Sequence, residues 1–478
     1  MAVLVALAAL SGCVRYHPQP LDPPRLERDY RSRSLDDAGL RAFVVASHTP
    51  PPAWPPGELD LAALTLIASY WSPELDVARA RIRLAEAGLI TAGARPNPAV
   101  NTGAGYSTSR ESAVVFHFEP SLLIETARKR SYRILQARKT LEASRLALVE
   151  EAWRMRSRVR TALVDRVFAV RRLELLQAED NVRAEALSIL EQRLRVGEVS
   201  RPDVDAARLE LSAVRLAIEA AKGQAQESLA KLAAAAGLPV SSLAGIAVRG
   251  LAAESPPRPE SLPLGRVQEA GLLNRIDLRR ASLEYEALEA ALQLEIARQY
   301  PDFELLPGHS FDEGHHKFAL GPALPLPVRN RNRGPIAEAE ARRQEAQAGF
   351  VVLQAQAIAA METALARYRA ALDEVAESER QLALVQRERE SAVRRALEAG
   401  EADRLAWAGV RVQAAALARA RLEALEKVQA AWGALEDAVQ RPLEEGLELP
   451  AIPETNPREV VEKVLHRLKS VPRGPARP

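Results

Sequence analysis

Apolar residues recur at every seventh position along two long stretches of the chain. In the first stretch, the series consists of Leu141, Leu148, Met155, Ala162, Ala169 and Leu176. In the second, it consists of Val204, Leu211, Ile218, Ala225 and Leu232, accompanied by Ala207, Val214, Ala221, Ser228 and Ala235. This spacing is typical of coiled-coil seams, and small residues in a seam let two helices approach closely. No proline occurs from 121 to 201 or from 336 to 441, so we predict very long helices in both regions.

A glycine followed by a glutamate interrupts each long helical region, at Gly197-Glu198 and at Gly400-Glu401. Glycine adopts the positive φ that a tight helix reversal needs. We therefore predict that each glycine lies at the tip of an antiparallel helical hairpin. Pro202 suits the first turn of the returning helix, where a backbone N–H has no intrahelical partner.

Shorter stretches alternate with a period of two. Val114, Phe116 and Phe118 alternate with Val115, His117 and Glu119, which is typical of a strand with one apolar and one polar face. We predict one strand pair over 100–109 and 112–120. A second pair is predicted over 303–311 and 317–325, joined by a polar turn at Asp312-Glu313-Gly314.

The two halves of the chain repeat each other. A shift of about 203 residues carries Gly197 onto Gly400, Leu75 onto Leu278 and Ala78 onto Ala281. Each half has the same order: a helix (75–94 or 278–299), a strand pair and a long helical hairpin. We therefore predict an internal duplication, with repeats over 61–250 and 265–445 and a proline-containing linker over 251–264.

The predicted fold is mainly α with a small β part. Four strands are too few to close a barrel, for which about eight are the practical minimum. Past residue 13 we find no apolar stretch near the ~20 residues that a membrane-spanning helix needs, so a membrane crossing would require a closed β-barrel. Three chains would supply twelve strands, an even number within the observed range, and would place their long helices side by side as a tube.

The N-terminus resembles a bacterial lipoprotein signal. An apolar run over 2–10 leads into Leu10-Ser11-Gly12-Cys13, and Cys13 is the only cysteine in the chain. We predict a signal peptide over 1–12 and a lipid on Cys13; the alternative is a lone buried cysteine. Residues 13–60 are rich in proline and are predicted to form an extended tether, and 446–478 form a C-terminal tail.

Charge and motifs exclude several classes of function. Acidic and basic residues are interleaved, with a net charge of +2, so no basic field suited to nucleic acid stands out. We find no catalytic motif and no phosphate-binding loop, and we predict neither an enzyme nor a cofactor.

His309, His315 and His316 lie near Asp312 and Glu313 in one predicted loop. They are weak candidates for a metal site, the alternative being a solvated loop.

Taken together, these features resemble the outer membrane factor (TolC-like) family of efflux ducts. The duplicated order of helix, strand pair and hairpin carries the resemblance over nearly all of 61–445. The segment Leu324-Pro325-Leu326-Pro327-Val328-Arg329-Asn330-Arg331-Asn332-Arg333-Gly334 is similar to a stretch of the heavy-metal-type (CzcC/CusC-like) branch. The resemblance implies a homotrimer in which a twelve-stranded barrel crosses the outer membrane and an α-barrel of helical hairpins extends into the periplasm.

The same resemblance implies partners and sites. The hairpin tips would dock a periplasmic membrane-fusion adaptor fed by an inner-membrane pump of the resistance-nodulation-division type. The docking residues would be Arg195, Val196, Gly197, Glu198, Ser200, Gly400, Glu401 and Asp403. Asp203 corresponds to an acidic residue near the periplasmic entrance of the family, and the alternative is a carboxylate that only complements a helix N-terminus.

Two other functions are compatible with the sequence. One is a lipid-anchored periplasmic coiled-coil adaptor or structural protein. The other is an outer-membrane duct of a protein secretion system, since a tunnel does not encode its cargo. Within the efflux function, the substrate would be a metal cation or a small toxic organic compound.

Overall fold

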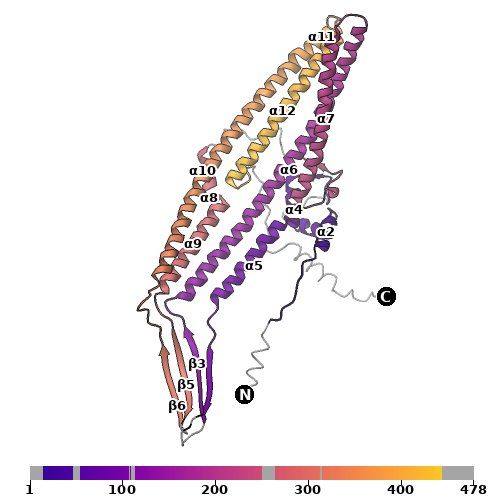
Figure 1. Ribbon diagram of the computed structural model, residues 1–478. Helices are drawn as coiled ribbons and strands as arrows, with labels where there is room; N and C mark the ends of the chain where they lie inside the picture. Colours follow the sequence, from indigo (N-terminus) through magenta and orange to yellow (C-terminus); the bar gives the residue numbers. More distant parts are fainter. Residues whose placement is uncertain are drawn as a thin grey trace, which may run out of the picture.

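The protein is a long rod with a β-sheet at one end and helical hairpin tips at the other (Figure 1). The computed structural model describes residues 14–46, 54–106, 108, 114–249, 264–312 and 315–443. We refer to the two extremities as the sheet end and the tip end. Cys13, the linker and the C-terminal tail lie outside the described residues.

The first repeat has the predicted order of elements. Helix α5 (Pro73–Gly93) leads into strands β2 (Ala99–Tyr106) and β3 (Val114–Ile124). The 67-residue helix α6 (Lys129–Arg195) then runs to the tip end, and α7 (Arg201–Ala236) returns from it. At ~1.5 Å per residue, α6 alone is roughly 100 Å long.

The second repeat follows the same order, which confirms the duplication. Helices α8 (Leu264–Asn274) and α9 (Ile276–Ala297) precede strands β5 (Phe303–Asp312) and β6 (His315–Ala323). The chain then runs to the tip end through α10 (Arg333–Leu384), a π-helical segment (Val385–Glu390) and α11 (Ser391–Glu398). It returns as α12 (Arg404–Val439).

The heptad positions form the predicted seams. In α7, every member of the leading series is buried: Val204, Leu211, Ile218, Ala225 and Leu232. In α6, Leu141, Leu148, Met155, Ala162 and Leu176 are buried. The helical hairpins are therefore held by apolar contacts along their length, as the period predicts.

The prediction of an extended N-terminal tether is wrong for much of 13–60. This region contains α2 (Pro23–Arg31) and α3 (Ala38–Val45), whose first turns are capped by the carboxylates of Asp22 and Asp37. Leu40 and Val44 of α3 are fully buried in the core around α4 (Leu61–Trp71). A two-stranded parallel sheet, β1 (Glu58–Leu59) with β4 (Ala247–Val248), closes the same region. Pro23 and Pro24 lie at the first turn of α2, where proline is tolerated, and the other described prolines of this region lie outside the helices.

The first strand pair also differs in its bounds. We predicted that β3 ends at Pro120, whereas the strand continues to Ile124. Pro120 pairs with Val100 of β2, but the pairing of β3 with β5 is interrupted from Glu119 to Ser121. Proline lacks the N–H that a second ladder would use, so it breaks one ladder without ending the strand.

One helical run, 333–398, is long and apolar enough to cross a membrane by length and composition alone. This corrects the expectation that no such stretch exists past residue 13. The reason is its alanine content, since Ala348–Leu365 contains a single charged residue, Glu362. Val351 and Val352 in this stretch are 58% and 55% exposed, so the chain itself leaves an apolar surface of α10 uncovered.

Candidate functional site

The four strands at the sheet end form one sheet in the order β2-β3-β5-β6. Residues paired across an antiparallel ladder point to the same face, so the register divides the side chains into two sets. The apolar face consists of Val100, Thr102, Ala104, Tyr106, Val114, Phe116, Phe118, Pro120, Leu122, Ile124, Phe303, Leu305, Pro307, His309, Phe311, His316, Phe318, Leu320 and Pro322. The polar face includes Asn101, His117, Glu119, Ser121, Glu304, Ser310, Asp312, His315 and Lys317.

The apolar face is exposed in the single chain. Tyr106, Phe318 and Leu320 are 78%, 81% and 71% exposed, and every large hydrophobic side chain of the strands that is exposed belongs to this face. β2 and β6 are the edges of the sheet. A sheet with an uncovered apolar face and two edges requires either lipid or other chains to cover it.

The histidines do not share the loop that we predicted. His309 and His316 lie on the apolar face, whereas His315 and Asp312 lie on the polar face, where Asp312 forms an ion pair of 3.0 Å with Lys317. Strand alternation separates them, because β5 and β6 reach to within two residues of each other. Among the described residues, no group of three or more His, Cys, Asp or Glu side chains is arranged to hold a metal ion.

At the tip end, both predicted glycines adopt the left-handed conformation. The φ angles are +79° at Gly197 and +75° at Gly400, and beyond the adjacent residues no atom lies within 4 Å of the position a Cβ would take at either glycine. The turns are therefore open to an approaching partner. An ion pair of 2.7 Å between Arg193 and Asp403 joins the first tip to the second.

The two acidic residues near the tips have depressed pKa values. Hydrogen bonds from the Ser200 hydroxyl and the Ser200 backbone N–H hold the pKa of Asp203 below its usual range. The backbone N–H of Ala406 and then the Arg193 guanidinium lower the pKa of Asp403 in the same way. Asp203 thus belongs to a capping box at the start of α7, and its exposed carboxylate remains ionised at the tip end.

A polar cluster of Thr126, Lys129, Tyr300 and Asp302 lies at the boundary between the sheet and the helices, and the sequence alone did not predict it. The Lys129 ammonium donates to Asp302 (2.7 Å) and to the Tyr300 carbonyl (2.6 Å), and the Thr126 N–H also donates to Asp302 (2.7 Å). Burial opposes the charge of Asp302, but these hydrogen bonds outweigh it and lower its pKa. The cluster joins the start of α6 to the start of β5, and so connects the two repeats where the chain changes from sheet to helix.

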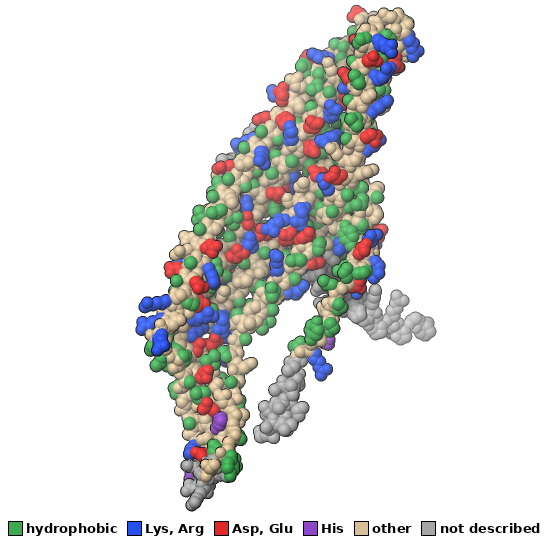
Figure 2. All heavy atoms as spheres, viewed as in Figure 1, with side chains coloured by type: hydrophobic (Ala, Val, Ile, Leu, Met, Phe, Trp, Pro, Cys, Tyr) green, Lys and Arg blue, Asp and Glu red, His purple; other side chains and the backbone are tan. Residues whose placement is uncertain are grey.

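Charged side chains also connect the repeats along the helices. Glu150 and Arg280 join α6 to α9 at 2.8 Å, and Arg172 and Glu426 join α6 to α12 at 2.6 Å. Figure 2 shows acidic and basic side chains lying together over the middle of the helices. The sequence alone does not predict these pairs, because they depend on the packing of one repeat against the other.

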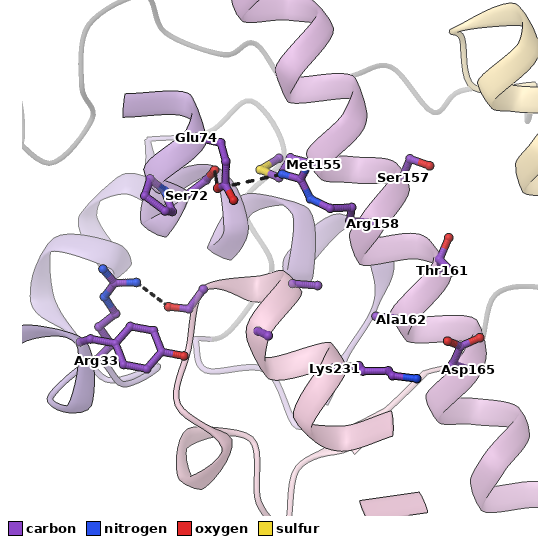
Figure 3. A pocket seen from close by; sticks show the side chains of 15 residues that line it. Arg33, Ser72, Glu74, Met155, Ser157, Arg158, Thr161, Ala162, Asp165 and Lys231 are labelled. Carbon is purple, nitrogen blue, oxygen red and sulfur yellow. Dashed lines mark hydrogen bonds and ion pairs between the residues drawn. The ribbon is translucent and has the colours of Figure 1, made fainter. Parts of the chain in front are cut away.

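A groove of about 650 Å³ lies where the N-terminal helices meet α5, α6 and α7 (Figure 3). Arg33 closes one end, with its guanidinium stacked on Tyr30 and Trp71 and donating to the Gly237 carbonyl at 2.7 Å. Along the groove, Glu74 faces Arg158, and Lys231 extends toward Asp165. Opposite charges face each other across the groove. The groove therefore carries charges of both signs and does not concentrate charge of one sign beside the long helices.

Comparisons with known proteins agree with this architecture. Residues 68–238 match the family described as Outer membrane efflux protein. The cobalt-zinc-cadmium resistance protein CzcC of Cupriavidus metallidurans is 27% identical over 293 residues, which cover 61% of this chain and 68% of CzcC. The outer membrane protein VceC of Vibrio cholerae shares the fold with a TM-score of 0.65 and 20% identity, over 80% of this chain and 97% of VceC.

CusC, whose structures describe transmembrane channel formation, has a TM-score of 0.63 at 17% identity, over 83% of this chain and 97% of CusC. The likeness to VceC and CusC covers four fifths or more of this chain, whereas the family match lies within the first repeat. Residues 68–238 thus match the outer membrane efflux protein family in sequence, and the chain shares its duplicated fold with the outer membrane protein VceC and with CusC.

Proposed function

We propose that three copies of this chain form a channel that carries metal cations out through the outer membrane, as the outermost part of a tripartite efflux system. The observation that carries the proposal is the exposed apolar face of an open four-stranded sheet. Three such sheets joined at their edges would close a twelve-stranded barrel with the apolar face toward lipid. The polar face, with Glu119 and Glu304, would then line the lumen.

The uncovered surface of α10 supports the same assembly. Val351 and Val352 belong to an apolar stretch of the helical part, far along the chain from the strands. A neighbouring copy would bury this stretch while its strands pair with β2 or β6. If the chain were instead an adaptor or spacer held to the membrane only by a lipid, nothing would cover the apolar face of its sheet.

The hairpin tips are the proposed docking surface for a periplasmic adaptor, itself fed by an inner-membrane pump of the resistance-nodulation-division type. Their residues are Arg195, Val196, Gly197, Glu198, Ser200, Gly400, Glu401 and Asp403, and the open space around both glycines supports their access. Gly197→Leu and Gly400→Leu add a side chain there at a conformational cost of about 1–2 kcal/mol each. Both variants should assemble normally but fail to crosslink to the adaptor; full crosslinking would contradict the docking role.

Asp203 is the proposed entrance gate. Its carboxylate is exposed at the start of α7, and the low pKa keeps it charged. Three-fold symmetry would turn one carboxylate per chain into a ring, which attracts cations at a pore entrance. The capping bonds from Ser200 orient this charge and do not remove it.

The substrate class rests on the relative. CzcC is a cobalt-zinc-cadmium resistance protein, and the Leu324–Gly334 segment points to the same branch. Deleting the gene should lower the tolerance of the host for cobalt, zinc and cadmium, and the intact gene should restore it. If the deletion lowered tolerance to organic compounds alone, the proposed metal substrate would be wrong, but the proposed role as an efflux channel would stand.

Cys13 is the proposed lipid anchor. The lipobox Leu10-Ser11-Gly12-Cys13 supports it, and the first described residues lead from there into α2. Incorporation of labelled palmitate should disappear in Cys13→Ser, while the barrel still inserts. Palmitate labelling that persists in Cys13→Ser would contradict lipidation at this residue.

A further inference from the structure

Two imidazoles lie together on the apolar face of the β5–β6 hairpin. His309 Nε2 and His316 Nδ1 are 3.1 Å apart, and the two rings are stacked with centroids 5.3 Å apart at an interplanar angle of 18°. Phe318 packs against His309, and Phe311 packs against His316, at centroid distances of 4.9 and 5.0 Å. The register explains the meeting, because His309 pairs with Phe318 and His316 pairs with Phe311, which places the histidines on one diagonal.

The separation of the two nitrogens suits a metal ion as well as a shared proton. Zinc–imidazole bonds of about 2.0–2.1 Å in tetrahedral geometry place two nitrogen ligands about 3.3 Å apart. The nitrogens of His309 and His316 are 3.1 Å apart and face each other, so both rings must turn as well as separate by a few tenths of an ångström for the two nitrogens to face one ion. Phe318 and Phe311 each pack against one imidazole and keep the two rings close to each other.

The position of the pair determines which ligands could join it. Asp312, His315 and Lys317 point to the opposite face, so none of them can complete the coordination. Two imidazoles leave the remaining positions to water. Imidazole favours zinc, copper and nickel over magnesium and calcium, whose preferred ligands are oxygens.

We propose that His309 and His316 form a two-histidine site for a divalent transition-metal ion, one per chain, at the outer rim of the barrel. The site rests on the proposed function only for its placement: the end of β5 and the start of β6 lie at the end of the sheet farthest from the helices (Figure 1). It lies on the face opposite to the lumen and would bind metal from outside the channel, after export. Binding displaces the proton that lies between the two nitrogens, because each nitrogen must offer a free lone pair to the ion.

The test is zinc binding by the full-length protein, purified in detergent with a histidine-free affinity tag and stripped with chelator. Isothermal titration should find one zinc ion per chain. His309→Gln and His316→Gln should each lower the affinity at least tenfold. His315→Gln, next in sequence but on the other face, is the matched control and should bind as the unmodified protein does. With Cu²⁺ as the probe, electron paramagnetic resonance should show two nitrogen ligands that become one in either variant.

Equal zinc affinity in all three variants, or no binding by the unmodified protein, would overturn the proposal. The metal tolerance of cells separates this result from the proposed function. His309→Gln and His316→Gln should leave tolerance unchanged, because neither residue faces the lumen. A channel that exports metal but binds no zinc at this pair would refute the site and leave the function intact.

Discussion

At the scale of single residues, Asp203 has one role that a single chain shows and a second role that we propose for the assembly. Asp203 accepts two hydrogen bonds from Ser200, which is the arrangement that a helix start needs. In the proposed trimer, symmetry would bring three Asp203 carboxylates into a ring. A measurement on the assembled channel is therefore needed to detect the ring.

Asp203→Asn should therefore separate the two roles. The amide oxygen can still accept from the Ser200 N–H, so the melting temperature should stay nearly unchanged, but the ring loses its charge. We expect a lower cation selectivity in planar bilayers and weaker block by trivalent cations. Ser200→Ala is the control, since it removes a capping bond and keeps the charge. If Ser200→Ala shifts selectivity as strongly as Asp203→Asn does, the ring is the wrong explanation.

Asp302 gives a prediction about pH. Its pKa is lowered in the folded protein, so the stabilisation it provides is complete above the usual carboxylate pKa and disappears as the pH falls through the lowered value. Asp302→Asn leaves Lys129, only 8% exposed, without its charged partner. We expect a loss of about 1–2 kcal/mol at neutral pH, measured as a lower melting temperature. The difference between the two proteins should shrink toward pH 3, and a difference independent of pH would contradict this account.

At the scale of elements, the sheet faces are the most informative feature. Alternation along one strand, with Phe116 and Phe118 against His117 and Glu119, was sufficient to predict two faces. The sequence could not reveal that four strands from two repeats share this division, because that depends on the register between β3 and β5. The same limit hid the diagonal pairing of His309 with His316.

Two neighbouring positions on β6 test the assignment of the faces. Leu320 is on the apolar face and Ala319 is on the polar face. Leu320→Arg should cost about 2–4 kcal/mol if its position is in the middle of the bilayer, and less near an interface. We expect it to reduce membrane insertion, measured by heat-modifiable migration, whereas Ala319→Arg should insert normally. The reverse order would place the lumen on the other face.

Other elements show where sequence patterns mislead. The prolines of 13–60 suggested an extended tether, but Asp22 and Asp37 cap two helices there, and Leu40 packs into the core. Heptads predicted the hairpin seams because each seam lies within one repeat. The contacts between repeats, such as Glu150 with Arg280 and Arg172 with Glu426, use charged residues that have no period of their own.

At the scale of the whole molecule, the chain is incomplete as a membrane protein. Its sheet has two edges and one bare apolar face, and α10 adds an exposed apolar stretch along the helical part. Closing the sheet with further copies satisfies both features at once. The duplication explains how one chain supplies four strands and two hairpins in equivalent positions.

The most direct test is native mass spectrometry of the protein extracted from outer membranes in mild detergent. The account predicts a single species with three times the mass of the mature chain, including its lipid. A folded monomer that remains in the membrane fraction would contradict it, because four strands cannot close a barrel.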